Sequence, residues 1–280
     1  MFGRGGNMLS CIRIGSVSLL FAALLAALLV FPLQAQNSEQ VEVAPPPLHR
    51  VDPPAPGTSP EELEKRGDEL RTDKNYLDAE DFYQAALKVA PGNAAVLNKI
   101  GISQLMMRRD KEAKKSFERA IKADRNHADA YNNLCVAYYA LRNYNAAIKQ
   151  CQRAISLKDD ASSYYYNLGA TYFAKKEFDK ALQNFSRAVQ LDPDILERSS
   201  HAGVQAKLTS PEDQAHYDYL LAKLYARTGS PERSLHYLKK AMEEGYRDIK
   251  NVYKDDEFST LRKDPRFAEL MATKTTAIPD

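Results

Sequence analysis

The chain has 280 residues, of which 44% are hydrophobic and 27% charged, and its formal net charge is +2 at pH 7. It holds too few glycines and prolines, 12 and 14, for a low-complexity or fibrous protein. The small positive charge comes from Met1–Ala35, which carries two arginines and no acidic residue. The rest of the chain is balanced, so it lacks the overall basic charge that would favour nucleic-acid binding.

The N-terminus is typical of an export signal. Two arginines precede an apolar run, Ile14–Phe31, after which the helix-breaking Pro32 leads to the small residue Ala35. This order predicts a signal peptide over residues 1–35 that is cleaved after Ala35. The alternative is an uncleaved anchor to the inner membrane through residues 14–31, because that run reaches the shortest length of a membrane span. Both interpretations predict an exported protein, either periplasmic or secreted, or tethered to the membrane.

Residues 36–60 are rich in proline, with Pro45, Pro46 and Pro47 in a row. Such a segment favours extended conformations and has too little apolar surface to fold. We expect a disordered linker that ends where Ser59 can cap a helix and Pro60 can occupy its first turn.

A spacing of small, aromatic and aliphatic residues defines a repeat of 34 residues, which is clearest in Ser162–Ile195. We number the places of the repeat from Ser162, and the pattern lies at places 4, 7, 8, 11, 20, 24, 27 and 32. Its residues are Tyr165, Leu168, Gly169, Tyr172, Ala181, Phe185, Ala188 and Pro193. The first four share one face of a helix and the next three share one face of a second helix. Two helices therefore fold against each other, and proline ends the unit.

The same register extends back through the chain. The equivalents of Gly169 are Cys135, Gly101 and Gly67, and those of Ala181 are Ala147, Ala113 and Ala79. The pattern resembles the tetratricopeptide repeat. This resemblance implies an all-α fold, an α-solenoid of stacked antiparallel helix pairs in a right-handed superhelix.

The predicted array covers residues 60–248. Its repeats are 60–93, 94–127, 128–161 and 162–195, followed by an insertion, 196–214, and a displaced fifth repeat, 215–248. The insertion is predicted because residues 196–210 are polar where a helix needs apolar residues. Residues 249–272 are similar to a capping segment that follows many bacterial arrays of this family, and residues 273–280 form a tail.

No motif of catalysis is present in the sequence. It has no HExxH pair, GxSxG turn, glycine-rich phosphate loop or CxxC pair. His216 and His236 both fall in the fifth repeat, but no third metal ligand accompanies them. We therefore predict no catalytic residue, cofactor or metal, and a protein that is not an enzyme.

Cys135 and Cys151 occupy places 8 and 24 of one repeat, on helices that face each other. An exported protein could join them in a disulfide, provided that their Cα atoms lie within about 7 Å. Alternatively, both are small apolar residues that replace the glycine and the aromatic ring of the other repeats. The sequence leaves both alternatives open.

The resemblance also implies a binding groove on the concave side, lined by the first helix of each repeat, where family members bind an extended or helical segment of a partner. Asparagines there could bond a peptide backbone and aromatic side chains could anchor it. The predicted groove residues are Asn98, Lys99, Ile102, Asn132, Asn133, Val136, Tyr139, Tyr166, Asn167, Phe173, Tyr219, Lys223 and Arg227.

The sequence thus predicts a non-enzymatic scaffold of the cell envelope that binds a protein partner, a peptide or a helix, in this groove. The alternative is a structural subunit of an envelope assembly or secretion complex that uses its convex face or its ends. A cochaperone is disfavoured, because Ile102, Val136 and Ala170 stand where the family's carboxylate-clamping members have a polar residue. No nucleic-acid partner is predicted.

Overall fold

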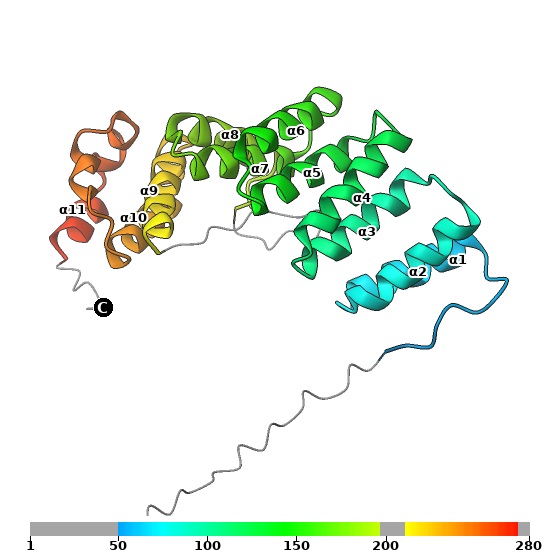
Figure 1. The fold of residues 1–280 in the computed structure, drawn as a ribbon. Helices are drawn as coiled ribbons and strands as arrows, with labels where there is room; N and C mark the ends of the chain where they lie inside the picture. The colour runs from blue at the N-terminus through cyan, green and yellow to red at the C-terminus, as the bar shows by residue number, and fades with distance from the viewer. Residues whose placement is uncertain (1–49, 197–210, 274–280) are drawn as a thin grey trace, which may run out of the picture. The chain divides into compact units, whose positions relative to one another are not determined.

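The computed structural model describes residues 50–196 and 211–273, all within one unit of the chain, Arg50–Asp280. The predicted signal peptide, most of the linker and insertion, and the end of the tail lie outside the described residues. Helix pairs follow one another along this unit (Figure 1). The first four pairs are α1 (Pro60–Thr72) with α2 (Tyr76–Val89), α3 (Ala94–Met106) with α4 (Asp110–Ala123), α5 (Ala128–Ala140) with α6 (Tyr144–Leu157), and α7 (Ser162–Ala174) with α8 (Phe178–Leu191).

The helix bounds repeat without drift. In each of these four pairs the first helix occupies places 1 to 13 and the second occupies places 17 to 30. The helices of each pair pack on each other, and each second helix packs on the first helix of the next pair. This confirms the predicted all-α fold of stacked helix pairs, and the described part of the chain contains no strand.

A fifth pair follows the insertion. It consists of α9 (Pro211–Arg227) and α10 (Pro231–Glu243), and α10 begins at place 17 when the repeat is counted from residue 215. Short 3-10 helices come next, η1 (Ile249–Tyr253), η2 (Asp256–Phe258) and η3 (Leu261–Lys263), and then α11 (Pro265–Ala272). Phe258, Leu261 and Phe267 from this last segment are buried in one apolar cluster with residues of α9 and α10.

The turn inside each pair adopts the same backbone conformation at place 15. Lys74, Arg108, Arg142 and Lys176 have φ angles of 63°, 61°, 58° and 62°, and the equivalent Gly229 has a φ of 76°. Residues other than glycine rarely adopt this left-handed conformation. Because four long cationic side chains adopt it, the packing of the two helices sets the turn geometry.

The seam between paired helices requires a small residue at place 8. A Cβ atom added to Gly67, Gly101 or Gly169 would lie 2.5, 2.4 or 2.8 Å from a ring atom of the aromatic residue at place 24. Those rings are fully buried, so they have little room to move. The glycine therefore allows the close approach of the helices that the sequence pattern predicts.

Polar contacts fix the N-terminal end of the array. The Ser59 hydroxyl accepts a hydrogen bond from the Glu62 backbone N–H at 3.2 Å, and the Glu62 carboxylate accepts one from the Ser59 backbone N–H at 3.3 Å. This capping box starts α1 at Pro60, as predicted. Ahead of it, the Arg50 guanidinium forms ion pairs with Asp78 and Asp81 of α2.

Among the helices that the structure describes, none combines the length and the apolar character that crossing a membrane requires. The apolar run at residues 14–31 is not among them.

Candidate functional site

The predicted groove residues come from the first helices α3, α5, α7 and α9. Buried asparagines join three of these helices: the Asn133 side-chain amide donates to the Asn98 carbonyl oxygen at 3.0 Å, and the Asn167 amide donates to that of Asn132 at 2.9 Å. Asn132 also donates to Asn133 at 3.4 Å, which makes the chain of bonds continuous. All four side chains are at most 7% exposed. They hold α3, α5 and α7 side by side, and a contact with a partner's backbone stays a prediction.

Two predicted lysines form ion pairs within the molecule. The Lys99 ammonium lies 2.6 Å from carboxylate oxygens of both Glu64 and Asp68, which joins α3 to α1. The Lys223 ammonium lies 3.2 Å from Asp255 and therefore joins α9 to the segment after α10. Both charges are balanced inside the chain.

The aromatic residues of the predicted groove differ in exposure. Phe173 and Tyr219 are 3% exposed, whereas Tyr139 and Tyr166 are half-buried. Phe173 packs edge-on against Tyr217 of α9, with 5.6 Å between ring centroids. The Tyr219 ring stacks on Tyr246 at 4.4 Å, and its hydroxyl donates to Asp255 at 2.8 Å. Burial, reinforced by that hydrogen bond, raises the pKa of Tyr219 well above its ordinary value, so this hydroxyl remains a donor.

Four predicted residues of α3, α5 and α7 keep part of their surface exposed: Lys99, Ile102, Tyr139 and Tyr166. We call this surface the first-helix face. Val136 lies among the same helices but is 4% exposed. The face combines one aliphatic side chain, two aromatic rings and a lysine whose charge is already balanced, so contacts on it would be mainly apolar and aromatic.

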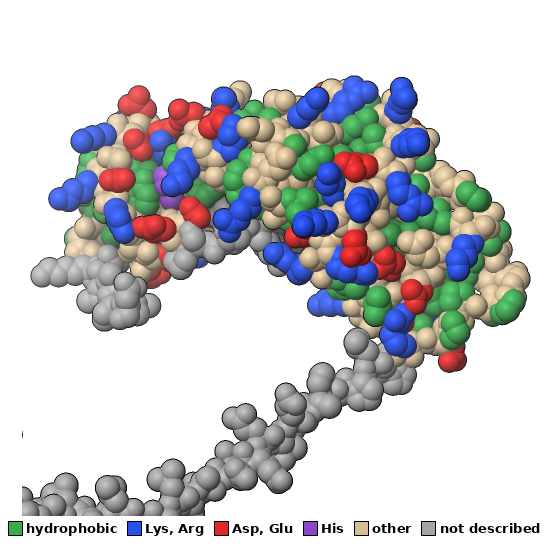
Figure 2. Space-filling model, in the orientation of Figure 1, with side chains coloured by type: hydrophobic (Ala, Val, Ile, Leu, Met, Phe, Trp, Pro, Cys, Tyr) green, Lys and Arg blue, Asp and Glu red, His purple; other side chains and the backbone are tan. Residues whose placement is uncertain are grey.

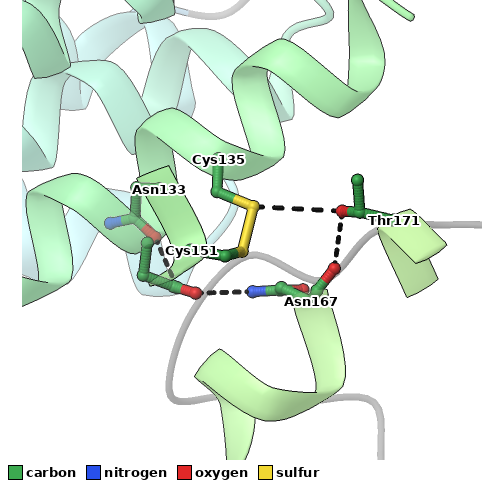
Figure 3. Close-up of a disulfide and its surroundings, with 6 residues drawn as sticks. Asn133, Cys135, Cys151, Asn167 and Thr171 are labelled. Atoms are coloured by element: carbon green, nitrogen blue, oxygen red, sulfur yellow. Dashed lines mark hydrogen bonds between the residues drawn. A yellow bond between two sulfur atoms is a disulfide. The ribbon is translucent and has the colours of Figure 1, made fainter. Parts of the chain in front are cut away.

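The structure joins Cys135 and Cys151 in a disulfide, with Cα atoms 5.3 Å apart (Figure 3). Both residues are fully buried, at the two places where other repeats hold the glycine and the aromatic ring. The Cys135 sulfur also lies 3.9 Å from the Thr171 hydroxyl of α7, and that hydroxyl donates to the Asn167 backbone carbonyl at 2.7 Å. The disulfide therefore lies next to the asparagine chain that aligns the first helices.

Of the predicted groove residues, Arg227 alone lines the pocket of about 910 Å³ beside α8. Its lining residues are Gln152, Tyr165, Leu168, Tyr172, Gln183, Asn184, Ser186, Arg187, Gln190, Arg227 and Thr228. One sequence signal could have indicated a basic surface here, because α6 contains no acidic residue and α8 contains only Asp179. Over the central helices as a whole, Figure 2 shows many Lys and Arg side chains with Asp and Glu side chains among them.

Metal-binding chemistry finds no support in the residues that the structure describes, where no group of three or more histidine, cysteine or acidic side chains could hold an ion. His216 instead packs on the Phe178 ring, with centroids 3.9 Å apart, and close to Tyr246. Burial lowers the pKa of His216 below its ordinary value. At neutral pH this imidazole is therefore an uncharged packing residue.

Comparison with protein families gives matches over the central repeats. One model of the tetratricopeptide repeat matches residues 94–127, and a second matches residues 128–160 and 162–195. A search of curated proteins gave no match.

Several solved structures are similar to the chain. MamA shares 26% identity over 66% of this chain and 96% of its own, with a TM-score of 0.45. YrrB, described as a tetratricopeptide repeat protein with an unusual peptide-binding site, shares 21% identity over 69% of this chain and 89% of its own, with a TM-score of 0.44. TTC0263 of Thermus thermophilus shares 19% identity over 77% of this chain and 100% of its own, with a TM-score of 0.48. The family matches over residues 94–160 and 162–195, together with the stacked helix pairs, identify this part of the chain as tetratricopeptide repeats.

Proposed function

We propose that the chain is a scaffold that binds a segment of a protein partner along the first-helix face. The tetratricopeptide repeat is a non-catalytic interaction scaffold, and the family match confirms the prediction that the chain is not an enzyme. One observation carries the proposal: buried asparagines align α3, α5 and α7, so that side chains from consecutive repeats form one surface.

The exposed parts of this face indicate how a segment would be held. Ile102 and Tyr139 come from neighbouring repeats and are half-buried, so each has a fixed base and an exposed end. Aromatic side chains held in this way lose little conformational entropy on binding and dominate many interfaces. A helix or extended segment that crosses α3 and α5 would contact both residues.

The packing of residues 249–272 supports a capping role for this segment at the end of the array. Phe258 and Phe267 are 0% and 4% exposed and pack with apolar residues of α9 and α10. Terminal repeats need such cover because no further repeat buries their apolar side. We infer that this segment closes the array and leaves the first-helix face as its binding surface.

Export of the chain is part of the proposal. It is supported by the apolar run Ile14–Phe31 followed by Pro32 and Ala35, and by the disulfide between Cys135 and Cys151, since disulfides persist in oxidising compartments. Sequencing the N-terminus of the protein recovered from the envelope fraction tests it. A mature terminus at residue 36 is expected, whereas protein recovered only from the cytoplasm would contradict export.

Photo-crosslinking in cells tests the binding surface. A photoreactive phenylalanine analogue replaces Ile102 or Tyr139, and matched controls carry it at the exposed Lys115 or Arg119 of α4. We expect one common protein adduct from the two face positions and none from the controls. The same adduct from control positions, with none from the face, would refute the proposed surface and favour contacts through the outer side of the array.

A further inference from the structure

The pocket beside α8 has a distinct charge character. Its charged lining residues are Arg187 and Arg227, and no aspartate or glutamate lines it. Both arginines are exposed. Within the described part of the chain neither forms an ion pair, whereas Arg109, Arg233 and Arg266 each contact a carboxylate.

Neutral groups hold the two arginines in place. The Arg187 guanidinium lies over the Tyr165 ring, 5.8 Å from its centroid, and donates to the Gln190 side-chain oxygen at 3.4 Å. The Arg227 guanidinium donates to the hydroxyl of Ser186, which is 7% exposed. A guanidinium has five N–H donors in a planar fork that matches a carboxylate. Each arginine therefore keeps its full charge and most of its donors for an anionic ligand.

The rest of the lining matches a peptide. Amide side chains can donate to carbonyl groups and accept from N–H groups of an extended backbone, and the pocket has four of them: Gln152, Gln183, Asn184 and Gln190. Leu168 and the rings of Tyr165 and Tyr172 supply apolar surface between the polar groups. The volume, about 910 Å³, is at the upper end of that of ordinary ligand pockets, so a single inorganic anion would fill little of it.

We propose that this pocket binds an acidic, extended segment of a protein partner, with Arg187 and Arg227 pairing with its carboxylates. The pocket shares no residue with the first-helix face, so it would give the scaffold a second binding site of different chemistry. Contacts on the face are mainly apolar, whereas contacts in the pocket depend on charge.

Panning a random heptapeptide display library against the full-length chain tests this site. The variants are Arg187→Gln/Arg227→Gln, Arg187→Gln alone, and a control, Arg119→Gln/Lys122→Gln, which changes two exposed cations on α4. We expect the unaltered chain and the control to enrich peptides rich in Asp and Glu, and the double variant to lose them. Enrichment of no peptides, or of the same peptides by the double variant, would overturn the proposal.

Fluorescence anisotropy with one enriched peptide measures how much each change weakens peptide binding. Replacing its acidic residues by Gln or Asn, or using the double variant, should each weaken binding about tenfold or more, because charge-assisted hydrogen bonds are lost. Arg187→Gln alone should give a smaller loss and unchanged thermal unfolding, since this side chain is exposed. Complete displacement by millimolar inorganic phosphate would show a site for small anions and overturn the peptide assignment.

Two further outcomes separate this proposal from others. The variant Ile102→Glu/Tyr139→Ala should retrieve the same acidic peptides. The test of the pocket therefore does not depend on whether the first-helix face binds a partner. Sedimentation shows whether copies of the chain associate with one another. Self-association that the double variant abolishes would identify a second copy as the occupant, and would overturn the assignment to a separate partner.

Discussion

The junction between repeats one and two differs from those between repeats two, three and four, although the same places of the repeat form all of them. At the first junction, Lys99 at place 6 donates to Glu64 at place 5 of the preceding repeat. At the next two junctions, Asn133 donates to Asn98, and Asn167 donates to Asn132, across the same separation of 35 residues. At places 5 and 6, one junction is therefore ionic and two are neutral.

Burial explains why the two kinds of contact are not equivalent. The side chains of Lys99 and Glu64 are 24% and 27% exposed, so solvent and salt weaken their attraction. The asparagines are almost fully buried, where salt has little effect but an unpaired amide is costly. We therefore expect the N-terminal repeat to separate first when ionic strength rises, and the central repeats to depend on every member of their asparagine chain.

The largest effect should come from the disulfide of the central repeats. Cys135→Ser/Cys151→Ser should lower the free energy of unfolding by about 3 kcal/mol, because the closed loop has a sequence separation of 16. Cys135→Gly/Cys151→Phe is the matched control, since it restores the glycine and ring of Gly101 and Phe117. Urea denaturation should show the control to be more stable than the serine variant and unaffected by reductant. Equal stability of both variants would contradict this account of the seam.

Breaking the asparagine chain should cost somewhat less. Asn133→Ala removes the partner of Asn98 and of Asn132, and an unpaired buried amide costs about 2 kcal/mol. The control Asn145→Ala changes an exposed residue of α6 and should have little effect. The loss for Asn133→Ala should be the same in low and high salt. A loss that disappears in high salt would mean that this junction is not neutral.

Exchanging the chemistry of the first junction should have a smaller effect. Lys99→Ala should cost about 1 kcal/mol or less in low salt and almost nothing in high salt. Lys99→Asn/Glu64→Asn rebuilds the contact with the amides of the central junctions, and its stability should not vary with salt. If the amide variant remains as salt-dependent as the unaltered chain, other ion pairs, such as that between Arg109 and Glu80, control the junction.

The smallest change in stability should come from the turn at place 15, and it should be equal in the N-terminal repeat and in the central repeats. Lys74→Gly and Arg142→Gly each remove a side chain from the left-handed conformation, at φ angles of 63° and 58°. The relief is partly offset by the greater freedom of glycine in the unfolded chain, so we expect a gain of about 0.5 kcal/mol in each case. The denaturation midpoints of the two variants, compared with that of the unaltered chain, measure this gain. A gain in one region alone would show that the turns are not equivalent.

Much of the fold could be predicted because the small and aromatic residues between the paired helices recur in each repeat. Gly101 and Phe117 mark a close helix crossing that their spacing alone indicates. The roles of Asn133 and Lys99 could not be predicted in this way. A helical pattern gives the face on which a side chain lies, but not whether an acceptor on the neighbouring repeat is within bonding distance. Both residues were predicted for the groove, and in the structure both join repeats.

The fifth repeat was harder to interpret for a related reason. Phe173 is predicted as an anchor and Tyr219 as a further groove residue, but Tyr217 packs on Phe173 and Tyr246 packs on Tyr219. The insertion separates Phe173 from Tyr217 in sequence, so the 34-residue step does not align these two residues. Tyr246 follows α10, outside the helices that the repeat pattern predicts. Arg187 recurs at place 26 as Arg153 and Arg119, so the repeat register places it on a second helix but does not indicate the pocket that it lines.

Hydrogen exchange of the full-length chain, measured by mass spectrometry in low and in high sodium chloride, tests the contrast between the junctions most directly. Amides of α1 and α2 should exchange faster in high salt, because local opening at an ionic junction becomes easier. Amides of α5 and α7 should exchange at the same rate in both conditions. Equal acceleration in both regions, or none in α1 and α2, would contradict the assignment of an ionic first junction and neutral central ones.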